Sequence, residues 1–102
     1  MTEKDIVYLI NQLFEIESKS NARNIDFLER NFQRINDHFE NTGFTILNPI
    51  GEKYKETRTD LDAHVSGNKI DQLKVIEVLK PIIYKNEDSS ITLIQKGNVI
   101  VG

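Results

Sequence analysis

The side chains of this chain that could act together in chemistry stand mainly in one short segment. Asp60, Asp62 and His64 alternate in Asp60-Leu61-Asp62-Ala63-His64, so a strand would place two carboxylates and an imidazole on one face. Such groups are metal-ligand types. No second cluster of His, Asp or Glu completes a site, and we therefore predict that the protein binds no metal.

The remaining candidates for chemistry are isolated. His38 lies between charged neighbours and is typical of an exposed helical residue. The pairs Gly51-Glu52 and Gly97-Asn98 lack the spacing of a phosphate-binding loop. No serine or threonine stands in a nucleophile motif, and the absence of cysteine excludes disulfides and thiolate chemistry. We therefore expect a protein that is not an enzyme and carries no cofactor.

Composition restricts the class of partner. The chain has 102 residues, enough for one core with an attached arm, and carries 13 Lys and Arg against 16 Asp and Glu. No basic cluster could neutralise a run of phosphates, so we expect no nucleic-acid partner. The first residues lack the pattern of a signal peptide and no apolar run has membrane-spanning length. We expect a cytoplasmic protein that does not enter a membrane.

Residues 1–42 are predicted to form a helical arm. Neither Pro nor Gly occurs from Asp5 to Asn41, and apolar residues recur at steps of three and four. Gly43 can take the left-handed conformation that follows a helix end. The steps continue as the seam of a coiled coil, and the apolar residues of that seam that we expect at a dimer interface are Phe14, Ile25, Leu28, Phe32, Ile35 and Phe39.

Two geometries of the arm fit the same residues. A polar stretch at Ser18–Asn21 separates the seam from an upstream stripe that includes Leu9 and Leu13. Either one long helix crosses this stretch, or two helices fold back near residues 18–23 as a hairpin. Both geometries leave apolar side chains uncovered and favour a homodimer, as a two- or four-helix bundle. The alternative is that both stripes pack on the protein's own β-domain.

Residues 43–102 are predicted to form a small, mostly antiparallel β-domain, which makes the fold class α+β. Strands are expected at 44–47, 75–79, 82–84, 91–95 and 99–101, with an interruption at Pro81. The polar segment 52–68 is expected to be a long loop or hairpin. Such loops often carry binding residues.

The order of these parts resembles GrpE, the nucleotide exchange factor of DnaK-type chaperones. In that family a helix leads to a glycine, an apolar strand, a Gly-Glu pair and then an aromatic residue, and a Val-x-Glu-Val segment follows. The corresponding residues here are Gly43, Gly51-Glu52, Tyr54 and Val75–Val78. The chain departs from the family where Gln95-Lys96-Gly97 replaces an Arg-Pro-Ala element, where Thr57–Ala63 replaces a His-Glu-Ala element, and in its shorter helical arm.

The resemblance implies a homodimer whose β-domain inserts into the nucleotide-binding domain of a DnaK-type chaperone and promotes ADP release. The partner-binding residues expected on the β-domain are Glu52, Tyr54, Arg58, Asp60, Lys80, Gln95 and Lys96. For Tyr54, packing over the sheet edge is the alternative role, and for Arg58 and Lys96 it is simple solvation. The alternative function is a dimeric adaptor that has kept the scaffold without exchange activity.

Overall fold

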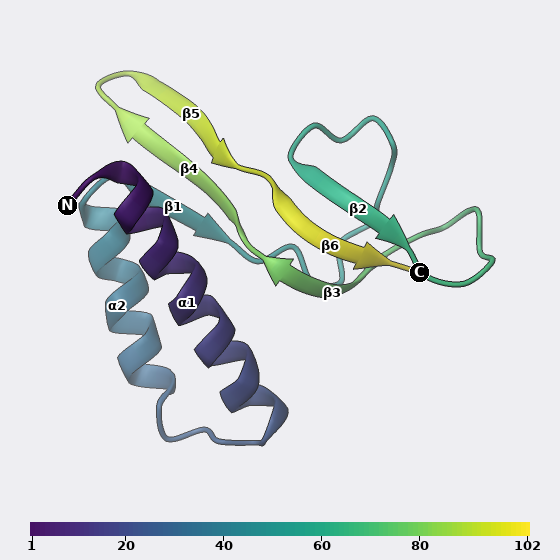
Figure 1. The fold of residues 1–102 in the computed structure, drawn as a ribbon, viewed down its shortest axis with the longest axis horizontal. Coiled ribbons are helices and arrows are strands. Elements are labelled where there is room, and N and C mark those ends of the chain that lie inside the picture. The colour runs from purple at the N-terminus through teal and green to yellow at the C-terminus, as the bar shows by residue number, and fades with distance from the viewer.

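Two helices precede six strands in the computed structural model, which describes residues 1–102 (Figure 1). The predicted α+β class is confirmed. In chain order the elements are α1 (Glu3–Ala22), α2 (Glu29–Asn41), β1 (Phe44–Leu47), β2 (Leu61–Val65), β3 (Val75–Lys80), β4 (Ile82–Glu87), β5 (Ser90–Gln95) and β6 (Gly97–Val101). Neither helix has the length and apolar character needed to cross a bilayer.

The helices form a hairpin, one of the two geometries predicted for the arm. Thr2 caps α1, because its hydroxyl accepts a hydrogen bond from the Asp5 amide at 3.2 Å and the Asp5 carboxylate accepts one from the Thr2 amide at 3.1 Å. Helix α1 then ends, and Asn24 takes a left-handed φ of 56°. The Ser20 carbonyl accepts the Ile25 amide at 3.0 Å and holds the turn.

This turn changes the expected dimer seam. The uninterrupted coiled-coil seam from Phe14 to Phe39 does not form, because the chain reverses direction between α1 and α2. Ile25 lies in the turn, and Leu28 is the residue that precedes α2. The remaining seam residues are divided between the two helices.

The strands form two three-stranded sheets rather than the single sheet expected from the sequence. Residues 75–101 make one long bent hairpin, in which β4 pairs with β5 and β3 pairs with β6. It is interrupted at Pro81 on one side and at Lys96 on the other. β1 joins β4 to give the order β1-β4-β5, and β2 joins β6 in parallel to give β2-β6-β3. Pro81 thus separates two strands, as predicted.

The two sheets have separate cores. Strand alternation after Pro81 sends Ile82 and Ile83 to opposite sides. Ile83 packs with Ile10 of α1 and Phe44 of β1, while Ile82 belongs to a cluster with Leu61, Val75, Val99 and Val101. The helices therefore cover the β1-β4-β5 sheet, and the β2-β6-β3 sheet extends beyond them (Figure 1). The alternative that the arm packs on the protein's own β-domain is thus correct for part of its apolar surface.

Candidate partner-binding site

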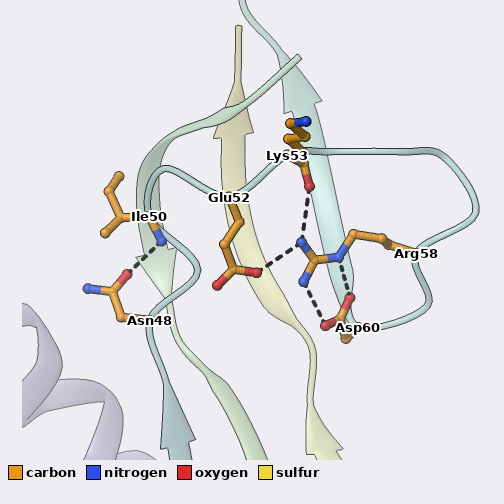
Figure 2. A network of polar contacts seen from close by, with 6 residues as sticks. All are labelled: Asn48, Ile50, Glu52, Lys53, Arg58 and Asp60. Carbon is orange, nitrogen blue, oxygen red and sulfur yellow. Dashed lines mark hydrogen bonds and ion pairs between the residues drawn. The ribbon is translucent and has the colours of Figure 1, made fainter. Parts of the chain in front are cut away.

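The loop between β1 and β2 is organised by the Arg58 guanidinium. Its Nε and Nη2 donate to the two carboxylate oxygens of Asp60 at 3.0 and 2.8 Å. Nη1 donates to Glu52 Oε1 at 3.1 Å and to the Lys53 carbonyl at 3.2 Å (Figure 2). These contacts join three of the predicted partner-binding residues, Glu52, Arg58 and Asp60.

This network satisfies Arg58 and Asp60 within the chain. Their side chains are only 23% and 24% exposed. The hydrogen bond from Arg58 lowers the pKa of Asp60, and the same bond raises the pKa of Arg58. A bidentate pair of this kind fixes the loop. Glu52, at 50% exposure, is the member of the network with most surface left for a partner.

Tyr54 also has a structural role in the loop. Its ring packs against the core cluster of the second sheet, and its amide donates to the Leu73 carbonyl at 2.8 Å. Before it, the chain turns after β1 at Asn48-Pro49, where Asn48 Oδ1 accepts a hydrogen bond from the Ile50 amide at 3.1 Å (Figure 2). The side chain of Tyr54 is half-buried, which agrees with the alternative of packing at the sheet edge.

The alternating Asp60, Asp62 and His64 do not converge on one point. β2 does begin at Leu61, a strand within a segment that we expected to be a loop or hairpin. Asp60 precedes this strand and turns to Arg58, while Asp62 lies 3.9 Å from the Lys96 ammonium. No three His, Cys, Asp or Glu side chains in the chain come close enough to hold a metal ion.

Gln95 lies at the junction between the helical hairpin and the strands. Its Nε2 donates to Asn11 Oδ1 at 2.9 Å and to the Pro81 carbonyl at 2.8 Å, and its Oε1 accepts from Asn11 Nδ2 at 2.9 Å. These bonds tie α1 to both points at which the long hairpin bends. Gln95 is therefore occupied by contacts within the chain, a role that the sequence did not suggest.

The outward face of the β2-β6-β3 sheet brings the remaining candidates together. Asp62 of β2, Asn98 of β6 and Lys80 of β3 are in register and form one row across the sheet. Lys96 adjoins this row through its contact with Asp62. The row and its neighbours surround an open hollow of about 530 Å³, which we call the polar hollow, lined by Asp62, Ala63, His64, Lys80, Gln95, Lys96 and Asn98.

Charge in the polar hollow is unbalanced in favour of cations. Lys80 and Lys96 face a single carboxylate, Asp62, and the one ion pair among them is long and exposed. Such a pair contributes little stability. Asn98 Oδ1 is buried without a hydrogen-bond partner, which normally costs free energy. The polar hollow thus offers the ammonium groups of Lys80 and Lys96, which the fold itself leaves largely unused, whereas the Gln95 amide is already bonded to Asn11 and Pro81.

Four of the six predicted dimer residues line a second concave surface. A groove of about 230 Å³ runs between α1 and α2 and reaches β1; we call it the interhelix groove. Phe14, Phe32, Ile35 and Phe39 all line it. The other two predicted residues, Ile25 and Leu28, do not, because they lie at the hairpin turn.

Sequence reasoning missed Asp62, His64 and Asn98 as members of a shared surface with the two lysines. The alternation Leu61-x-Ala63-x-Val65 was the available signal for β2, but its parallel pairing with the distant β6 was not readable from local pattern. Together these residues can bind acidic or hydrogen-bonding groups of another molecule by charge and amide contacts.

Comparison of this chain with protein-family models, with curated proteins and with solved structures finds no match.

Proposed function

We propose that this protein is a cytoplasmic, GrpE-like exchange factor, which uses its β-domain to bind the nucleotide-binding domain of a DnaK-type chaperone and promote ADP release. The observation that carries the proposal is the division of the molecule into two surfaces. The polar hollow lies on the β2-β6-β3 sheet, and the interhelix groove, which seven hydrophobic and five polar residues line, lies between the two helices. The first suits a protein partner, and the second suits a second copy of the chain.

The order of motifs supports the same proposal. Gly43 has a left-handed φ of 98° directly after α2 and leads into β1. The Gly51-Glu52 pair and Tyr54 then border the second sheet, since Gly51 and Glu52 share backbone hydrogen bonds with Val75, the first residue of β3, and the Tyr54 amide donates to the carbonyl of Leu73, just before it. Three of the elements that carry the resemblance, Gly51-Glu52, Tyr54 and Val75–Val78, therefore lie at the sheet proposed to bind the chaperone, whereas Gly43 lies beside Asn86 in the other sheet.

The mechanism requires only differential binding. An exchange factor that binds the open, nucleotide-free form of the chaperone more tightly than the ADP-bound form lowers the affinity for ADP by the same factor. The β2-β6-β3 sheet would insert into the nucleotide-binding domain of the chaperone. Lys80 and Lys96 would contact acidic groups of that domain. Glu52 would contribute from the adjoining loop.

Equilibrium binding to a purified nucleotide-binding domain, with and without saturating ADP, tests this proposal. We expect tight binding to the nucleotide-free domain and weaker binding in ADP. The Lys80→Glu/Lys96→Glu variant should lose affinity, because reversing both charges repels an acidic partner surface. Lys69→Glu, in an exposed loop outside the polar hollow, is the matched control and should bind as the wild type does. Equal affinity in the presence and absence of ADP would refute exchange by this mechanism.

The second candidate function is a dimeric adaptor without exchange activity. The observation that favours it concerns Gln95, which stands where the GrpE family has its Arg-Pro-Ala element. Its side chain forms hydrogen bonds with Asn11 and with the Pro81 carbonyl. An adaptor would bind its target without a dependence on ADP, so the same titration distinguishes the two functions.

A further inference from the structure

Lysines that are separated in the sequence come together beside the start of β3. Lys53, Lys55 and Lys74 line one open hollow of about 440 Å³, which we call the lysine hollow; its other lining residues are Tyr54, Gln72 and Leu73. All three lysines are exposed. None of them forms an ion pair, whereas Lys85 alone pairs with two carboxylates.

The backbone holds Lys53 and Lys74 directly opposite each other. The two residues form an antiparallel bridge. On one side of the bridge the Tyr54 amide donates to the Leu73 carbonyl at 2.8 Å, and on the other the amide after Lys74 donates to the carbonyl before Lys53 at 2.9 Å. This pattern defines a non-hydrogen-bonded pair, whose side chains lie close together on one face. Like charges in such a pair are destabilising.

The nearby carboxylates do not neutralise this pair. Glu52 and Asp60 bind the Arg58 guanidinium. Glu56 and Asp71 are neighbours of the lining residues in sequence, but neither lines the lysine hollow and neither pairs with a lysine. Every charged side chain that lines the lysine hollow is therefore a cation.

We propose that the lysine hollow binds a small phosphorylated compound through one phosphate or two linked phosphates. A phosphate group carries about −1.5 to −2 charges at pH 7, so one or two phosphates balance three ammonium groups better than a single carboxylate does. Gln72 and Tyr54 can donate further hydrogen bonds from the lining. The net charge of −3 repels a long polyanion such as nucleic acid, which favours a compact ligand.

The site goes beyond the proposed function and does not depend on it. The lysine hollow shares no lining residue with the polar hollow, so it can be tested on the isolated protein without a chaperone. A phosphate placed between Lys53 and Lys74 turns their mutual repulsion into attraction. Removing one of these lysines should therefore relax the free protein and weaken the complex. For unit charges about 4 Å apart in water, the lost attraction corresponds to about a fivefold increase in Kd.

Titration with sodium pyrophosphate at constant ionic strength, followed by two-dimensional amide NMR, tests the proposal. We expect saturable shifts confined to the signals of residues 53–55 and 72–74. The Kd should rise at least about fivefold in Lys53→Gln and in Lys74→Gln. Lys4→Gln removes the same charge from an exposed position on α1 and is the matched control. It should keep the wild-type Kd.

Thermal unfolding supplies a second readout. Without phosphate, Lys53→Gln should melt no lower than the wild type, because the substitution removes a repulsion. With pyrophosphate, the Tm of the wild type and of Lys4→Gln should rise more than the Tm of Lys53→Gln. This difference separates binding from the general stabilisation that phosphate salts give to folded proteins.

Other outcomes would overturn the proposal. Shifts that do not saturate, or that spread over lysines across the whole surface, would show that these side chains are simply solvated. A wild-type Kd in both Lys53→Gln and Lys74→Gln would exclude the paired lysines as the site. Citrate that binds as tightly as pyrophosphate would refute the assignment to phosphate, and a phosphoserine peptide that binds more tightly would refute the small compound as the ligand.

Discussion

Replacing Gln95 with alanine should destabilise the whole protein, because the side chain joins α1 to the bend of the long hairpin. The substitution removes three hydrogen bonds, two shared with Asn11 and one to the Pro81 carbonyl. Each such bond contributes about 0.5–1.5 kcal/mol net. Since Gln95 is half-buried, we expect a loss of about 1.5–3 kcal/mol, which corresponds to a decrease in Tm of roughly 8–15 °C in a domain of this size.

A double-mutant cycle isolates the shared part of this loss. Asn11→Ala removes only the two bonds of the amide pair, so we expect a loss of about 1–2 kcal/mol. The coupling energy between Asn11→Ala and Gln95→Ala should be about 1 kcal/mol or more. Chemical denaturation of the wild type, the two single variants and the double variant measures it.

Gln33→Ala provides the control for this cycle. Gln33 also hydrogen-bonds through its amide, to Asp37 at 2.9 Å, but on the exposed surface of α2. We expect a loss below about 0.5 kcal/mol there. If Gln95→Ala were no more harmful than Gln33→Ala, or if the cycle showed no coupling, the reasoning that assigns Gln95 to the interior junction would be refuted.

Three further substitutions or conditions test the loop and the bend. Arg58→Ala should lower the free energy of unfolding, measured with denaturant, by about 1–3 kcal/mol, because it leaves Asp60 without its bidentate partner. An unchanged midpoint of unfolding would contradict this. The pKa of Asp60 is lowered in the folded chain from 3.8, so its stabilisation is present above that pH and lost as the pH falls through the folded pKa. Thermal unfolding on acidification should show this loss in the wild type and a smaller one in Arg58→Ala. Gly97→Ala would place a Cβ 2.9 Å from a side-chain atom of Leu61 and 3.0 Å from one of Ile82. We expect this crowding to lower the free energy of unfolding by about 1–3 kcal/mol. An unaltered Tm would show instead that the two side chains move aside.

Local sequence signals predicted the elements better than their partners. The helix end at Gly43, the strand after it and the interruption at Pro81 each depend on one residue and its neighbours, and each is present. β2 was missed because its five residues lie in a polar segment and pair with β6, far along the chain. A parallel pair of this kind leaves no local turn signal.

The candidate site was predicted in part for the same reason. Lys80 and Lys96 do lie together at the polar hollow. Arg58 and Gln95 were assigned to partner binding as polar residues expected on the surface of the β-domain, yet the side chains of both form hydrogen bonds within the chain. Composition cannot distinguish an unused polar side chain from one that is satisfied by a distant residue such as Asn11.

The measurement that most directly tests the central claim is the release rate of a fluorescent ADP analogue from a DnaK-type chaperone of the same source. The account predicts saturable acceleration by the wild type. It also predicts strongly reduced acceleration by Lys80→Glu/Lys96→Glu, with Lys69→Glu unaffected. Unchanged ADP release at saturating wild-type protein would contradict the exchange-factor function.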